Sequence, residues 1–111
     1  MTTIFGQIIE GSLPCEKVHE TSHELVIKDA FPKAPVHLFI IPKKPYENLH
    51  AIPESELDIV AHVAQVAQVV ADKVGVADNY RLVTNNGKGA GQTVFHLHFQ
   101  LLGGAELGDI A

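Results

Sequence analysis

Three polar residues, His96, His98 and Gln100, alternate with apolar residues near the end of the chain. A β-strand sends successive side chains to opposite faces, so a strand over residues 96–102 would present all three on one face and anchor the other face in the core. Imidazoles two residues apart on a strand lie roughly 6.5–7 Å apart, so one ligand along the strand could contact both rings and the amide. The plainer alternative is a strand whose outward face merely carries polar residues.

Further strands and two helices are expected to position this stretch. The predicted elements are a short helix over residues 3–10, strands over 17–20, 24–28, 36–41, 80–84 and 96–102, and a long helix from about residue 53 to about residue 74. The order helix, hairpin, strand, long helix, strand, strand is typical of an α+β domain with an antiparallel sheet of about five strands.

The apolar side chains of the two helices indicate what each helix packs against. The short helix, which Gly11 can end, places four large residues on one side: Ile4, Phe5, Ile8 and Ile9. The long helix has a wider apolar face, formed by Ile59, Val60, Val63, Ala64, Val66, Ala67, Val70 and Val74. A face this wide fits a helix packed on its own sheet and on a second copy of the chain, or a helix sunk more deeply into one core.

Length and composition limit the class of protein. With 111 residues, the chain is expected to form one domain over residues 1–111. Hydrophobic residues make up 46% and charged residues 19%, which is typical of a soluble globular protein. The net charge of -5 argues against binding long nucleic acids, which requires clustered lysine and arginine. The chain shows no apolar run of membrane-spanning length and no secretory signal at its start, so we expect no membrane partner and a cytoplasmic location.

Other candidate residues lie in turns or within an apolar strand. A glycine-rich segment, residues 85–93, precedes His96, and its three glycines allow backbone N–H groups to approach a phosphate. The segment lacks the spacing of a P-loop and is a weak signal by itself. Asp29 follows a predicted strand, where an aspartate commonly caps the next turn. His37 is the only polar side chain in the apolar strand over residues 36–41, where a lone histidine is more often a packed core residue than a catalyst.

Residues 91–104, with the sequence GQTVFHLHFQLLGG, resemble the signature of the histidine-triad superfamily, in which three histidines alternate with apolar residues. The chain is most similar to the small histidine-triad nucleotide-binding proteins. The third histidine of the pattern is Gln100 here. The likeness extends over nearly the whole chain, through Ile4-Phe5, Asp29, Ala34-Pro35-Val36-His37, Ile41-Pro42-Lys43-Lys44 and Asn85 to Gly104.

The resemblance implies a nucleotide-binding hydrolase that cleaves purine nucleoside 5′-phosphoramidates or related nucleotidyl conjugates, with no metal and no other cofactor. His98 would attack the α-phosphorus and carry the nucleotidyl group. His96, His37 and Gln100 would orient the reacting groups and offset the developing charge.

The same resemblance implies how the purine nucleotide is bound. The expected nucleotide-binding residues are Phe5, Ile8, Ile27, Asp29, Asn85, Gln92 and Thr93. Asp29 would accept hydrogen bonds from the ribose hydroxyls, while Asn85 and Thr93 would donate to the phosphate beside Gln92. Family members are homodimeric, so a homodimer is expected here as well.

Gln100 leaves two functional alternatives open. A glutamine can donate hydrogen bonds but never titrates. The hexose-1-phosphate uridylyltransferase and dinucleoside polyphosphate phosphorylase branches of the superfamily, whose enzymes are much longer, are similar in having glutamine at this place, and they transfer the nucleotide to a phosphate acceptor. Nucleotidyl transfer is therefore the enzymatic alternative, and a nucleotide-binding module with little catalysis is the other.

A zinc site is a further alternative. His37, His96 and His98 could reach one metal ion if their strands are adjacent. No supporting carboxylate or further cysteine is evident near them in the sequence. Cys15, the only cysteine, can form neither an intrachain disulfide nor a Cys-X-X-Cys zinc site.

Overall fold

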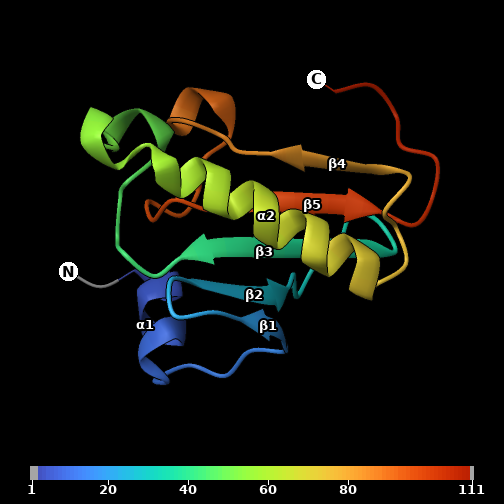
Figure 1. Cartoon of the computed structure of the whole chain (residues 1–111), viewed down its shortest axis with the longest axis horizontal. Helices are drawn as coiled ribbons and strands as arrows, with labels where there is room; N and C mark the ends of the chain where they lie inside the picture. Colours follow the sequence, from blue (N-terminus) through green and yellow to red (C-terminus); the bar gives the residue numbers. More distant parts are fainter. Residues whose placement is uncertain (1–2, 111) are drawn as a thin grey trace.

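The computed structural model of the protein describes residues 3–110. Its elements, in chain order, are α1 (Ile4–Glu10), β1 (Lys17–Glu20), β2 (Glu24–Lys28), β3 (Val36–Pro42), the 3-10 turns η1 (Leu49–Ala51) and η2 (Glu54–Glu56), α2 (Asp58–Lys73), β4 (Tyr80–Val83), the 3-10 turn η3 (Lys88–Ala90) and β5 (Phe99–Gly103) (Figure 1). The predicted order of helices and strands is confirmed. None of the helices within residues 3–110 is long and apolar enough to cross a lipid bilayer.

The five strands form one sheet in the spatial order β1-β2-β3-β5-β4. Every neighbouring pair is antiparallel, which confirms the predicted α+β class with an antiparallel sheet. Phe39 of β3 lies opposite both Ile27 of β2 and Gln100 of β5. Directly opposite residues point to the same face of a sheet, so these three side chains form a row across one face.

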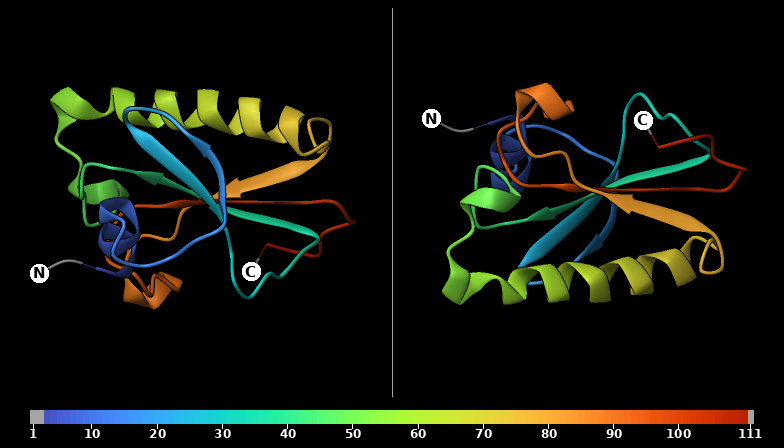
Figure 2. Two further views of the ribbon diagram at one scale, coloured as in Figure 1. Left: turned by 90° about the horizontal axis from the view of Figure 1, so that it is seen from below. Right: turned by 90° about the horizontal axis from the view of Figure 1, so that it is seen from above.

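The two faces of the sheet pack against different parts of the chain. α2 lies across one face, whereas α1 and η3 lie on the other (Figure 2). Alternation along β3 explains the division, because Leu38 and Ile40 belong to the core under α2 and Ile41 belongs to a smaller core under α1. The smaller core consists of Phe5, Leu25, Ile27 and Ile41.

Helix α1 has the predicted ends but a narrower buried face. The Thr3 hydroxyl accepts a hydrogen bond from the backbone N–H of Gly6 at 3.1 Å, and Gly11 ends the helix with a φ of 89°. Phe5 is buried, but Ile4 is 54% exposed, so the prediction that Ile4 packs with Phe5 is wrong. Phe5 occupies the centre of the buried face, and Ile4 lies 100° around the helix from it, farther than Ile8 or Ile9.

Helix α2 starts later than predicted. Pro53 precedes the separate turn η2, and the α-helix begins only at Asp58. A proline cannot donate a backbone hydrogen bond, so it suits the entry to such a turn. The helix ends near the predicted Val74, and Gly75 follows with a φ of 81°.

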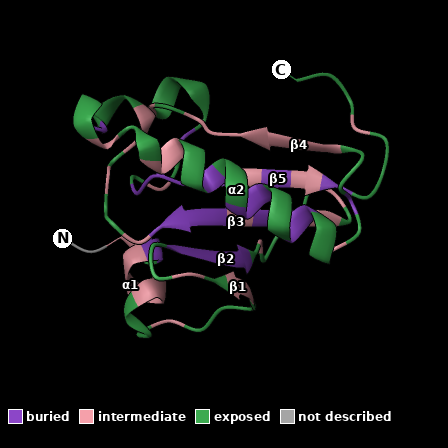
Figure 3. Cartoon of the chain, viewed as in Figure 1, coloured by how far each residue is buried: buried purple, intermediate pink, exposed green. Residues whose placement is uncertain are grey.

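One side of α2 is buried, and Ile59, Val60 and Val74 beside it are partly buried against the same core. The buried residues are Val63, Val66, Ala67, Val70 and Ala71, and Figure 3 shows buried and exposed bands alternating along the helix. Leu57, Ala61 and Ala64 are exposed. Their spacing of four and three residues places them in one stripe along the helix. Of the eight residues predicted for the wide apolar face, Ala64 is the one that is exposed, and the others are buried or packed against the core under α2. Both predicted alternatives, a helix sunk more deeply into one core and a helix also covered by a second copy, therefore stay predictions.

Candidate active site

The signature segment is only partly a strand. The predicted strand over residues 96–102 begins at Phe99, and both His96 and His98 precede it. The backbone before Phe99 bonds outside the sheet, because the carbonyl of His98 accepts from the Thr84 hydroxyl at 2.7 Å. Thr84 was not a predicted site residue, and its only signal was a hydroxyl at the end of the strand over residues 80–84.

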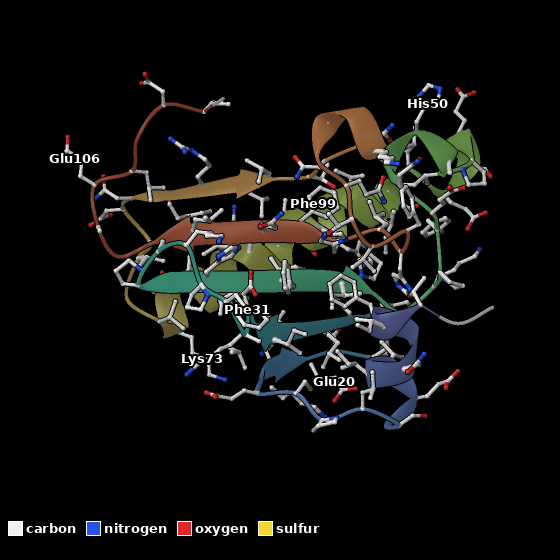
Figure 4. The ribbon with its side chains drawn as sticks, turned by 180° about the vertical axis from the view of Figure 1, so that it is seen from behind. Glu20, Phe31, His50, Lys73, Phe99 and Glu106 are labelled. Carbon is white, nitrogen blue, oxygen red and sulfur yellow. The ribbon has the colours of Figure 1, made fainter. Side chains whose placement is uncertain are left out.

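The expected division of side chains between the two faces is nevertheless preserved. Leu97 and Phe99 belong to the core under α2. The rings of His96 and His98 lie on the opposite face, with centroids 6.5 and 4.8 Å from the ring of Phe5 on α1. Figure 4 views this face, with α1 covering one end of the sheet and the loop that carries Phe31 lying before β3.

The environment of His98 determines which of its nitrogens can react. Its Nδ1 lies 2.8 Å from the carbonyl oxygen of His96, and a carbonyl only accepts, so Nδ1 carries the proton and Nε2 holds a lone pair. The ring meets Phe5 and Phe39 edge-on, and the residue is 8% exposed. Burial lowers the pKa of His98 below that of a free histidine. The ring is therefore neutral at neutral pH, with one nitrogen available as a nucleophile.

The ring of His96 is also fixed by a backbone carbonyl, here through Nε2 instead of Nδ1. Its Nε2–H donates to the backbone carbonyl of Pro42 at 2.7 Å. The residue is almost fully buried, and burial lowers its pKa. Its position ties the signature segment to the end of β3.

His37 and Gln100 form a hydrogen-bonded pair across β3 and β5. The backbone N–H of Lys33 donates to His37 Nδ1 at 2.9 Å, so the neutral ring carries its proton on Nε2. The Nε2–H group donates a hydrogen bond to Gln100 Oε1, which lies 2.7 Å away. The structure therefore brings His37 to the signature segment, as predicted from the resemblance.

Asp29 is the second group near His37. One carboxylate oxygen lies 3.4 Å from His37 Nε2. The other accepts a hydrogen bond from the backbone N–H of Phe31 at 2.9 Å, which is the turn-capping contact expected from the sequence. Its side chain is partly exposed, so a ligand can reach the carboxylate from solvent.

The predicted base-binding residues form an apolar patch beside the histidines. Phe5 and Ile27 are buried in the small core, and Ile8 packs against it. Phe39, which was not predicted, contacts this patch and lies between His37 and His98, with ring centroids 5.7 and 5.5 Å away. Its position two residues after His37 on one strand was the signal that could have identified it.

Gln92 braces the glycine-rich segment. The residue is 3% exposed, and its side-chain oxygen accepts a hydrogen bond from the Gly87 N–H at 2.8 Å. Its nitrogen donates to the carbonyls of Glu47 and Val94 at 2.8 and 3.1 Å. These three bonds occupy the amide, so Gln92 shapes the loop beside the site.

Asn85 and Thr93 lie at the two ends of this loop. Gly91, with a φ of 96°, is so close to Asn85 that an added Cβ would lie 3.4 Å from its Nδ2 atom. The left-handed backbone and this close approach both favour glycine there. Thr93 is exposed and Asn85 is half-buried, so both side chains are accessible.

The zinc alternative is not supported by the arrangement of side chains. Within residues 3–110, no three histidine, cysteine, aspartate or glutamate side chains are grouped as metal ligands. A large hollow of about 890 Å³ lies elsewhere, between the end of α2, the start of β4 and residues 104–107. None of the site histidines lines this hollow. The candidate site is therefore the sheet face that carries the histidines.

Comparison with known proteins shows the family and the fold of the chain. The HIT domain model matches residues 10–107. A HIT-like protein of Chlamydia pneumoniae is 52% identical over 109 residues, covering 98% of this chain and 99% of that protein. The structure of a HIT family hydrolase from Clostridium thermocellum is similar with a TM-score of 0.93 and 44% identity, covering 97% of this chain and 95% of the other. A histidine triad nucleotide-binding protein from Candida albicans has a TM-score of 0.81 and 29% identity, covering 99% and 86%.

The chain therefore belongs to the HIT family. It has the fold of proteins described as HIT family hydrolases and as histidine triad nucleotide-binding proteins.

Proposed function

We propose that the protein binds purine nucleotide conjugates and hydrolyses them through a nucleotidyl group carried on His98. The substrates are purine nucleoside 5′-phosphoramidates or related nucleotidyl conjugates. The observation that supports this most strongly is the state of His98, whose Nδ1–H donates to a backbone carbonyl at 2.8 Å and whose Nε2 keeps its lone pair.

In the first step, Nε2 of His98 attacks the α-phosphorus, and the leaving group departs with the electron pair of the breaking bond. A neutral imidazole suits this step because the negative oxygens of the phosphate repel an anionic nucleophile. The positive charge that develops on the ring is shared by Nδ1–H, which donates to the carbonyl of His96. Water then attacks the phosphorus, and His98 leaves as a neutral imidazole.

The glycine-rich segment supplies donors for the phosphoryl oxygens. These are the side chains of Asn85 and Thr93 and backbone N–H groups of the loop that Gln92 braces, other than those of Gly87, Ala90, Gly91 and Gln92, which already donate within the loop. Loss of one such preorganised donor typically lowers the rate by about 10²–10³-fold. The base lies against the patch of Phe5, Ile8 and Ile27, and the ribose hydroxyls donate to Asp29.

The test is release of AMP from adenosine 5′-phosphoramidate and from the p-nitrophenyl ester of AMP. The wild-type protein should turn over, and His98→Asn should lower kcat by at least about 10³-fold, as expected when a nucleophile is lost. His62→Asn is the matched control, because His62 is an exposed histidine on α2. Equal turnover by wild type and His98→Asn would contradict the proposal. Binding of AMP without turnover would instead indicate a nucleotide-binding module.

Nucleotidyl transfer to a phosphate acceptor is the second candidate, and Gln100 favours it. A phosphate acceptor attacks without having to lose a proton, so a glutamine that cannot titrate is sufficient beside it. Adding a nucleotide sugar together with a hexose phosphate tests this candidate. Formation of a new nucleotide sugar faster than free nucleotide would favour transfer over hydrolysis.

We also propose that two copies of the chain form a homodimer. Leu57, which directly precedes α2, and Ala61 and Ala64 on α2 form an exposed apolar stripe that a second copy could cover. β4 pairs only with β5 and leaves one backbone edge available within the protomer.

A further inference from the structure

The ring protons of the three site histidines all point at fixed acceptors of the protein. The Nε2–H of His96 donates to the Pro42 carbonyl at 2.7 Å, and the Nδ1–H of His98 donates to the His96 carbonyl at 2.8 Å. The Nε2–H of His37 donates to Gln100 Oε1 at 2.7 Å. None of these three rings therefore directs a proton toward a leaving group.

The same bonds determine the orientation of the Gln100 amide. Because His37 Nδ1 accepts from the Lys33 N–H, the ring has a proton to donate at Nε2. A reversed amide would place its NH₂ group against Nε2, and His37 would then need lone pairs on both nitrogens, which only an imidazolate anion has. The Gln100 oxygen thus accepts the hydrogen bond from His37. The two N–H groups of the amide can therefore donate to a ligand on this half-buried part of the face.

We infer that the site acts on nucleotidyl conjugates whose leaving group departs as a stable oxyanion, such as a phosphate, a carboxylate or an acidic phenol, and acts poorly on amides of alkylamines. Gln100 sets this preference, because amide N–H groups stabilise an oxygen that gains negative charge but do not transfer a proton. His37 is a positioning residue that fixes the amide. This inference rests on the proposed function and narrows its substrate class: of the nucleotidyl conjugates proposed above, those with a phosphorus–oxygen bond are the preferred substrates, and phosphoramidates react slowly.

The chemical step balances without a proton donor. The bond from His98 Nε2 to phosphorus forms, the bond from phosphorus to oxygen breaks, and its electron pair leaves with the oxygen as an anion. Water later replaces the histidine, and the proton that water loses is taken up by the released anion or by solvent. An alkylamine would have to leave as a far more basic nitrogen anion or take a proton that none of the rings supplies. Burial lowers the pKa of both His96 and His98, which keeps these rings neutral at neutral pH.

The experiment compares two AMP conjugates, the p-nitrophenyl ester and the amide of an alkylamine, in wild type and in Gln100→His. The readout is the ratio of kcat/KM for the ester to kcat/KM for the amide. A titratable ring at position 100 can donate a proton, and general acid catalysis typically contributes about 10²–10⁴-fold. The ratio should therefore fall at least about 10-fold in Gln100→His. An unchanged ratio would overturn the inference.

Two further variants test the roles of the amide and of His37. Gln100→Glu keeps an oxygen for His37 but replaces the N–H donors by a second oxygen, so kcat for the ester should fall about 10²-fold. His37→Gln removes the ring that orients the amide, so kcat for the ester should fall while KM changes little. A change in KM alone would contradict a positioning role for His37.

Failure of the inference can be told apart from failure of the proposed function. Release of nucleotide from neither conjugate, with no nucleotidyl group on His98, would overturn the proposed function. Release from both conjugates, with the same ester-to-amide ratio in wild type and Gln100→His, would overturn only the leaving-group preference.

Discussion

Replacing Gln92 with alanine separates bracing of the glycine-rich loop from direct binding of phosphate. The substitution removes three hydrogen bonds, one from the Gly87 N–H and two to the carbonyls of Glu47 and Val94. Each neutral hydrogen bond contributes about 1 kcal/mol net, so we expect the free energy of unfolding to fall by about 2–3 kcal/mol. For a chain of this length, this corresponds to a decrease of roughly 10 °C in Tm.

Urea unfolding measures the decrease in unfolding free energy, and thermal melting measures the decrease in Tm. Both are carried out at one fixed protein concentration, because the stability of a dimer depends on concentration. Gln68→Ala is the matched control, because Gln68 is an exposed glutamine on α2. It should change the free energy of unfolding by less than about 0.5 kcal/mol. Affinity for AMP should weaken in Gln92→Ala along with stability, as the loop N–H groups lose their alignment. Weakened AMP binding at an unchanged free energy of unfolding would refute the bracing role and indicate a direct contact with phosphate.

Three further predictions concern the core, the dimer and the pH dependence. Leu101 is fully buried, so Leu101→Ala should lower the free energy of unfolding by about 2–5 kcal/mol in urea titrations, whereas Val69→Ala, at a half-exposed position, should cost far less. An equal loss of unfolding free energy in the two variants would contradict the burial of Leu101 under α2. Ala64→Glu should shift the sedimentation of the protein from dimer to monomer, and Gln65→Glu on the same helix should not; a monomeric wild type would count against the dimer. Burial lowers the pKa of His98, and its neutral ring is the reactive form. The single-turnover rate of adduct formation should therefore stay constant as pH falls to about 6.5, the ordinary histidine value, and decrease only at lower pH as the ring becomes protonated. A midpoint above the ordinary value would contradict the effect of burial.

Local patterns were sufficient to predict the order of the elements. Apolar alternation, turn residues and the glycines at the helix ends depend on neighbours along the chain, and the strands β1 and β2 have the bounds predicted for them. The start of β5 was misplaced because the backbone before Phe99 bonds to distant partners. The hydroxyl of Thr84 and the carbonyl of Tyr46 bind His98 and Leu97, and no local pattern reports such contacts.

The site was only partly predictable for the same reason. Alternation placed His98 and Gln100 on one face, but it could not show that His37 would meet them. The pairing of β3 with β5 joins segments that are separated in sequence by α2 and β4. The resemblance supplied that link, whereas the orientation of the Gln100 amide required the hydrogen bonds of His37.

The most direct test of the central claim is to locate the covalent intermediate. The protein is mixed with the p-nitrophenyl ester of AMP, quenched at alkaline pH within one turnover and analysed by mass spectrometry of its peptides. We expect one added adenylyl group, on His98, and none in His98→Asn. An adenylyl group on another residue, or steady turnover with no adduct at any time, would contradict a nucleotidyl intermediate on His98.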